Sequence, residues 1–261
     1  MAITTHLNLD SLDGSNGFRL NVEEGYSLSS VSNAGDVNGD GLDDLSFSIH
    51  GDISKNHSIS SYVVFGKVAG FEAEMDLSEL DGNNGFRLNG WLIFSNAGDV
   101  NGDGFDDAII GNYFGDLAYV VFGKASGFDA TMNLSTLDGS NGFRLNVEEG
   151  YSLRSVSDAG DVNGDGFDDV IIGDFRFDFN GKNSGSSYVV FGKTSGFDAT
   201  INLSDLDGSN GFRLNGAIGE FNADFLVSNA GDVNGDGFDD VIIITRSDNV
   251  NLTYVVFGKA S

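Results

Sequence analysis

The chain has 261 residues, 40% of them hydrophobic, which is enough to bury a sizeable core and too apolar for a disordered protein. Its formal net charge of −27 argues against a nucleic-acid partner and against anionic membrane surfaces, because both require basic residues. No apolar run approaches the ~18 residues of a membrane span, and the absence of Cys excludes disulfides, thiol catalysis and thiolate metal sites.

One unit recurs along the chain, and its first complete copy begins at Ser29–Gly35. An acidic loop, Asp36–Asp44, follows, and then a short apolar run, Leu45–Ile49. Tyr62–Lys67 and Gly85–Asn89 complete the unit. The four non-acidic segments are short, rich in Val, Ile, Phe and Tyr, and bounded by Gly, Asn and Asp. This pattern predicts four β-strands, which we name A, B, C and D in this order.

The unit is present four times, with acidic loops that start 62 to 71 residues apart. The loops are Asp36–Asp44, Asp99–Asp107, Asp161–Asp169 and Asp232–Asp240. The B strands are expected at Leu45–Ile49, Ala108–Ile110, Val170–Ile172 and Val241–Ile244. The C strands are expected at Tyr62–Lys67, Tyr119–Lys124, Tyr188–Lys193 and Tyr254–Lys259, and the D strands at Gly17–Asn21, Gly85–Asn89, Gly142–Asn146 and Gly211–Asn215.

Repeats of four antiparallel strands predict an all-β fold, namely a β-propeller with four blades in a single domain over residues 1–261. The chain opens with a D strand, Gly17–Asn21, and stops after a C strand, Tyr254–Lys259. Pairing these two strands would close the ring and leave no open edge. The alternative is an eight-bladed ring made from two chains joined head-to-tail, so both a monomer and a homodimer stay open.

Each acidic loop predicts a calcium site. In the first copy, Asp36, Asn38 and Asp40 would supply side-chain oxygens, Leu42 its backbone carbonyl, and Asp44 would close the shell. An EF-hand is excluded because its twelfth position requires Glu, whereas Phe or Ile stands there in this chain. The sequence thus predicts four Ca²⁺ ions, one per repeat. The corresponding ligands in the other copies are Asp99, Asn101, Asp103, Phe105, Asp107; Asp161, Asn163, Asp165, Phe167, Asp169; and Asp232, Asn234, Asp236, Phe238, Asp240.

The order Gly-Tyr-Ser-Leu, Ser-Asn-Ala-Gly-Asp-Val-Asn-Gly-Asp-Gly, Asp-Asp and Ile-Ile-Gly resembles the FG-GAP repeat of integrin α-subunit propellers and their bacterial relatives. This resemblance implies that the loop joins strands A and B and binds calcium through the same five positions. The chain departs from the family at Gly111–Tyr113 and Gly173–Phe175, where Gly-Ala-Pro is expected, and it has no Pro. Integrin propellers have seven blades, so blade number and partner do not carry over. The complete tandem unit resembles arrays in large exported bacterial proteins.

The loops that vary among the copies are the D–A and B–C connections, which an antiparallel blade places on the face opposite the calcium loops. Loops on a rigid scaffold commonly carry recognition, so a protein or glycan ligand is expected on that face. The aromatic candidates there are Tyr26, Trp91, Tyr113, Phe114, Tyr151, Phe175 and Phe177.

The sequence favours a secreted or cell-surface adhesion module with structural calcium, because millimolar calcium occurs outside cells. The start of this chain shows no signal peptide. No nucleophile–base–orienter set is evident, so no enzyme is expected. Two alternatives remain: a hydrolase whose site lies on the variable face, and a ligand-free architectural repeat of a larger surface protein.

Four Arg residues and four Lys residues recur at fixed positions of the repeat. The sequence favours a structural role for these charges over a ring that binds an anion. For each Arg of a D strand, the expected partner is an Asp in a Leu-Asp-Gly turn. These Asp residues are Asp13, Asp81, Asp138 and Asp207.

Overall fold

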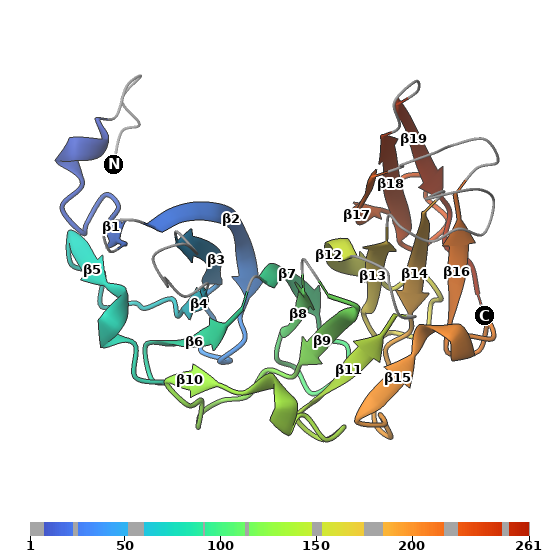
Figure 1. Cartoon of the computed structure of the whole chain (residues 1–261), viewed down its shortest axis with the longest axis horizontal. Coiled ribbons are helices and arrows are strands. Elements are labelled where there is room, and N and C mark those ends of the chain that lie inside the picture. The colour runs from blue at the N-terminus through green and yellow to red at the C-terminus, as the bar shows by residue number, and fades with distance from the viewer. Residues whose placement is uncertain are drawn as a thin grey trace.

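The computed structural model describes residues 8–22, 26–51, 60–90, 92–112, 115–147, 153–174, 185–216, 224–246 and 251–260. These residues form an all-β structure in which short 3₁₀ turns are the only helical elements described. Four main sheets, which we call sheets I to IV, follow one another along an open arc (Figure 1). Sheet I lies towards one end of this arc and sheet IV lies at the other.

Each main sheet is built from strands A, B and C of one repeat. Sheets I to III also contain the D strand that follows. Sheet I contains β2 (Tyr26–Gly35), β3 (Asp44–Gly51), β4 (Ser60–Val64) and β6 (Gly85–Asn89). Sheet II contains β7 (Leu92–Gly98), β8 (Asp107–Asn112), β9 (Leu117–Val121) and β11 (Gly142–Asn146). Sheet III contains β12 (Leu153–Gly160), β13 (Asp169–Asp174), β14 (Ser186–Val190) and β16 (Gly211–Asn215), and sheet IV contains β17 (Asp224–Gly231), β18 (Asp240–Arg246) and β19 (Asn251–Val256).

The antiparallel order A–B–C–D that the sequence predicts is confirmed in sheets I to III. The register of the C–D pair also repeats, since Tyr62 stands opposite Arg87 and Tyr188 opposite Arg213. In sheets I to III, the strands β4, β8, β13 and β14 are almost wholly buried because other elements cover both of their faces. Their continuous Val, Ile and Tyr runs are typical of strands that are covered on both sides.

The structure adds short elements that the sequence did not predict. Three two- or three-residue strands, β5 (Glu74–Asp76), β10 (Thr131–Met132) and β15 (Thr200–Asn202), pair in parallel with D strands. Each is followed by a 3₁₀ turn. The 3₁₀ turns are η1 (Leu9–Ser11), η3 (Leu77–Glu79), η4 (Leu134–Thr136) and η5 (Leu203–Asp205).

The core lies between consecutive sheets. Phe86 and Leu88 of sheet I pack against Phe94 of sheet II, and the same arrangement recurs between sheets II and III. A smaller cluster joins sheets III and IV through residues such as Val189 and Val227. Apolar burial between sheets therefore holds the arc together, as in a repeat protein whose units contact only their neighbours.

The structure does not close the four sheets into the ring that the sequence predicts. The first D strand, β1 (Arg19–Asn21), pairs with β5 and not with β19. Within the described residues, sheet IV has three strands. The pairing of β1 has a local reason, because β5 follows it in the chain as β10 follows β6. The two pairs are both parallel and have the same register. Blade number and ring closure stay predictions.

The predicted pairing of the repeated Arg with an Asp of the Leu-Asp-Gly turn is wrong for the first copy. Arg19 forms an ion pair with Glu74 across β1 and β5. Asp13 instead accepts hydrogen bonds from the backbone and the hydroxyl of Ser15, and this lowers the pKa of its carboxyl. The structural role predicted for the repeated Lys is supported, since the Lys124 ammonium lies 4.8 Å from the Phe128 ring centroid.

Candidate metal centres

Each acidic loop is a hairpin between strands A and B in which the first carboxylate caps the main chain of its own loop. In the first copy, Asp36 Oδ1 accepts a hydrogen bond from Asp40 N at 2.9 Å, and its Oδ2 accepts one from Gly41 N at 2.8 Å. Gly41 has a φ of +84°, a left-handed conformation that favours glycine and lets the chain fold back. The same bonds recur at Asp99, Asp161 and Asp232.

The ninth residue of each loop is an Asp that is fully buried at the start of strand B. In the first copy, Asp44 Oδ2 accepts from Val37 N at 3.1 Å, and its Oδ1 accepts from Gly66 N at 2.8 Å. This carboxylate therefore ties the acidic loop to the segment that follows strand C. The equivalent residues, which are also 0% exposed, are Asp107, Asp169 and Asp240.

Burial raises the pKa of the Asp44, Asp107 and Asp169 carboxyl groups, and their acidic neighbours raise it further. The pKa of Asp107 rises from 3.8 to about 8, mainly through desolvation and then through repulsion by Asp103 and Asp99, although backbone hydrogen bonds oppose the rise. Asp169 likewise rises to about 8 and Asp44 to about 7. Each of these three loops thus gathers negative charge around a buried carboxylate, an arrangement that a cation would stabilise.

The chemistry of the donor set fits a hard divalent cation. The predicted ligands are carboxylate, amide and carbonyl oxygens, and the described hydrogen bonds to Asp44 come from backbone N–H groups and not from a basic side chain. In the parts of the chain that the structure describes, no group of three or more His, Cys, Asp or Glu side chains has the spacing of a metal site. The sequence-predicted ligands therefore lie in one hairpin, but the structure does not arrange them as a coordination shell.

The raised pKa values predict how calcium-free stability depends on pH. Between about pH 4 and pH 8 the folded protein holds protons on Asp44, Asp107 and Asp169 that the unfolded chain has released, so stability falls as pH rises. We expect a loss of at least ~2 kcal/mol from pH 5 to pH 8, given that one pKa unit corresponds to ~1.4 kcal/mol. Carboxyls with lowered pKa, such as Asp138, titrate below this window. Urea unfolding in excess chelator measures the trend, and a stability that rises with pH contradicts it.

The eighth residue of each of the last three loops makes a contact that the sequence analysis did not foresee. Asp106 Oδ2, in sheet II, accepts a hydrogen bond from the backbone N–H of Asp36, in sheet I, at 2.8 Å. Asp168 and Asp239 accept the same bond from Asp99 and Asp161. This Asp therefore links each acidic loop to the preceding one. All four loops carry an Asp-Asp pair at their eighth and ninth positions. Strand alternation indicated a metal-binding role for the ninth residue only.

The seventh residue also reaches the preceding loop. A side chain at Gly39 would overlap the ring of Phe105, and one at Gly102 would overlap the ring of Phe167. The Phe side chains thus cover the glycine of the neighbouring hairpin. The backbone carbonyls predicted as ligands at Leu42, Phe105, Phe167 and Phe238 have no described partner that tests that role.

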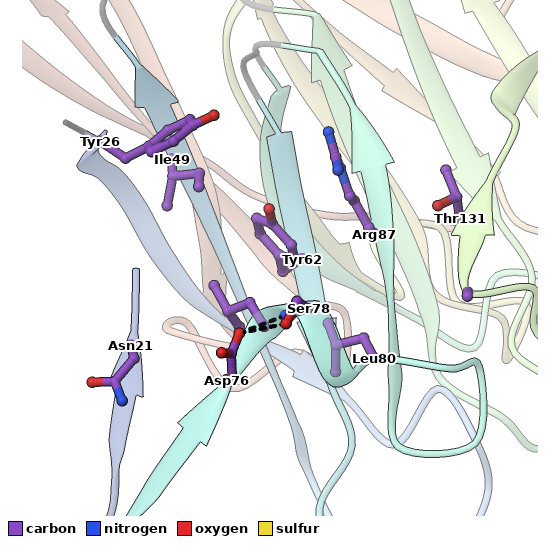
Figure 2. Close-up of a pocket in the computed structure, with 11 residues that line it drawn as sticks. Asn21, Tyr26, Ile49, Tyr62, Asp76, Ser78, Leu80, Arg87 and Thr131 are labelled. Atoms are coloured by element: carbon purple, nitrogen blue, oxygen red, sulfur yellow. Dashed lines mark hydrogen bonds between the residues drawn. The ribbon is translucent and has the colours of Figure 1, made fainter. Parts of the chain in front are cut away.

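A pocket of about 300 Å³ lies between β1, β5 and the strands of sheet I (Figure 2). Its lining includes Tyr26, Tyr62, Arg87 and Asp76, and the Asp76 carboxylate accepts a hydrogen bond from Ser78 N at 2.9 Å. A pocket lined by equivalent residues, Tyr119 among them, recurs between sheets I and II. A space that repeats with the sheets is better explained by the repeat itself than by a dedicated ligand.

The predicted recognition face falls largely outside the described residues. Trp91, Tyr113, Phe114, Tyr151, Phe175 and Phe177 all lie outside them, and only Tyr26 is described. Tyr26 is half-buried and packs against the hydrophobic cluster between sheet I and the strands β1 and β5. In the described part of the chain, no helix has the length and apolar character that a membrane span requires.

The comparisons with known proteins bear on the repeat. No family profile matches the chain. A stretch of 155 residues is 33% identical to integrin alpha-4 of Xenopus laevis. The chain is similar to an integrin α subunit. The match covers 56% of this chain but only 14% of the integrin, so the activity and partners of the whole integrin are not shown for this chain. The likeness and the all-β repeat agree with an integrin-α-like module.

Proposed function

We propose that the chain is a calcium-binding, integrin-like propeller module that serves adhesion or binding outside the cell or at its surface, with calcium in a structural role. The observation that carries this proposal is the acidic hairpin, repeated four times and closed each time by a fully buried Asp. A buried carboxylate beside other carboxylates is costly without a compensating positive charge. Calcium would supply that charge through oxygen ligands alone.

The residues that would hold calcium are the five loop positions that the sequence indicates. In the first copy, Asp36, Asn38, Asp40 and Asp44 would bind through side-chain oxygens and Leu42 through its carbonyl. Each oxygen of a carboxylate has more than one acceptor site, so Asp44 can keep its backbone hydrogen bonds while it binds. The ion would supply positive charge and would fix the hairpin that contacts the next sheet.

The binding role is supported by the likeness to integrin alpha-4 and by the division of the loops. The acidic hairpins are nearly identical in sequence, whereas the D–A and B–C connections differ between copies. We place the ligand face on the variable connections and expect a protein or a glycan as the ligand. The chain acts by binding and not by catalysis in this proposal.

Calcium titration tests the metal proposal. Equilibrium dialysis is expected to give four bound calcium ions per chain, and the Asp169→Asn variant is expected to bind three, because it loses one closing carboxylate. The Asp129→Asn variant removes one exposed carboxylate that is not part of any of the four loop sequences, and it is expected to bind four. Fewer than one bound ion per chain at millimolar calcium contradicts the proposal.

A binding array tests the adhesion role separately. The chain is applied to glycans and extracellular-matrix proteins in calcium and in excess chelator, and binding that is lost in chelator is expected. A parallel panel of hydrolase substrates is expected to show no turnover. Turnover that is abolished by changes in the variable loops would instead support the hydrolase alternative.

A further inference from the structure

The three contacts between consecutive sheets, which we call joints, share one set of polar bonds. At each joint the first Asp of the earlier loop donates its N–H to the eighth Asp of the later loop, at 2.8 to 3.0 Å. The Lys that follows strand C of the later sheet donates its N–H to the Val at the second loop position of the earlier sheet, at 2.9 Å in every joint. These Lys–Val pairs are Lys124–Val37, Lys193–Val100 and Lys259–Val162.

Sheet IV carries the earlier half of a fourth joint. Val255 is 45% exposed and Phe257 is 58% exposed, although the residues equivalent to Val255 in the other sheets are fully buried. Val233 is exposed as well, whereas its equivalents are buried in joints. A side chain at Gly98 would overlap Asp168, but a side chain at the equivalent Gly231 would meet nothing. This face has the chemistry of a joint surface, and no sheet in the described part of the chain covers it.

Sheet I carries the later half of the same joint. Val31 is 76% exposed, although Val156 and Val227 at the equivalent position are buried against a preceding sheet. Leu28 and Leu45 are exposed in the same way. Asp43 is the eighth residue of the first loop, the position that accepts the N–H bond at all three joints. An apolar face of this kind on a soluble domain indicates an interaction surface.

The strands at the two ends complete this pattern. In sheets I to III a C strand pairs with a D strand so that Tyr stands opposite Arg. β19 is a C strand that carries Tyr254 and has β18 as its described partner. β1 is a D strand that carries Arg19 and has β5 as its described partner. Within the described residues, one end of the arc therefore carries a D strand, and the other end carries a sheet with no D strand.

We propose that a second copy of this chain docks head-to-tail, so that sheet I of each copy completes the joint of sheet IV of the other. β1 of one copy then becomes the fourth strand of sheet IV in its partner, with Arg19 opposite Tyr254. A second copy is the occupant because the two end faces match each other by the same contacts that form the three internal joints. Because the arc is open and its ends lie apart (Figure 1), two arcs close one ring of eight sheets.

The mass in solution tests the proposal first. Light scattering of the chain at micromolar concentration is expected to give twice the 27.5 kDa mass of one chain. Val31→Asp and Phe257→Asp place a charge on one end face each, and each is expected to weaken the dimer at least roughly tenfold. Ser135→Asp adds the same charge at an exposed position in η4 and is expected to leave the mass unchanged. A monomer at this concentration overturns the proposal, and so does an open-ended polymer.

A disulfide trap tests whether β1 of one copy pairs with β19 of the other. Its readout does not depend on the stability of the variant. The chain has no Cys, so any disulfide in the Arg19→Cys, Tyr254→Cys double variant forms between the introduced thiols. Oxidation is expected to give a covalent dimer in denaturing, non-reducing gels, whereas the Arg19→Cys, Ser135→Cys control is expected to stay monomeric. A bond within one chain would indicate a ring of four sheets and would overturn the proposal. Neither readout depends on calcium stoichiometry, so this proposal and the metal proposal can fail separately.

Discussion

In saturating calcium, the midpoint of thermal unfolding is expected to lie roughly 20 to 40 °C above the midpoint in excess chelator. A ligand at a hundred times its dissociation constant stabilises the folded state by about 2.7 kcal/mol per site, so four sites contribute on the order of 11 kcal/mol. For domains of this size, 1 kcal/mol shifts the midpoint by roughly 2 to 4 °C. Calorimetry in calcium, in magnesium and in chelator measures the shift, and identical curves in calcium and chelator would rule out structural calcium.

The Asp107→Asn variant makes this prediction sharper, because its effect on stability is expected to reverse sign between chelator and calcium. In chelator at pH 8 the variant is expected to be at least as stable as the parent chain. It loses the bond that Asp107 Oδ2 accepts from Val100 N, but it removes a buried charge whose pKa is raised to about 8 and keeps an oxygen that accepts from Gly123 N. In calcium it is expected to be less stable, since one site is lost. Asp129→Asn controls for the change in net charge. Loss of stability in both conditions would show that Asp107 acts through its hydrogen bonds alone.

The repeat made most of the fold predictable from the sequence. The D strands Gly85–Asn89, Gly142–Asn146 and Gly211–Asn215 agree with the structure at both ends, because glycine and asparagine bound the apolar segment. The C strands end earlier than predicted, at Val64 in the first copy, because the residues after Val64 turn away to meet the acidic loop. β10 was not predictable, since two residues, Thr131 and Met132, carry no periodic pattern.

Contacts between repeats were harder to predict than the repeats themselves. The closing Asp of each loop stands out because strand alternation points it inward, and the structure buries it. The adjacent Asp106 acts across a joint, and no pattern within one repeat reveals which neighbour it meets. Ring closure stays a prediction for the same reason. Counting strands shows that the first D strand can pair with the last C strand. It does not show whether the two strands that pair belong to one chain or to two.

Removing one joint bond is expected to destabilise the protein only where a neighbouring sheet is present. Asp168→Ala leaves the N–H of Asp99 without its acceptor, and an unsatisfied, partly buried donor costs ~1 to 3 kcal/mol. Asp43→Ala removes the equivalent side chain at the open end of the arc and is expected to change stability by less than ~0.5 kcal/mol. Both changes are made in the Val31→Asp background, which keeps the end faces apart, and urea unfolding compares them.

A glycine pair separates this contact from backbone strain. Gly98 and Gly231 have nearly the same φ, +68° and +65°, so an added side chain is strained equally at both positions. Only at Gly98 does it also meet the Asp168 side chain. In the same background, Gly98→Ala is therefore expected to cost ~1 to 3 kcal/mol more than Gly231→Ala. Equal costs at the two positions would mean that the acidic loops do not couple neighbouring sheets, and the stabilising role assigned to the joints would then be wrong.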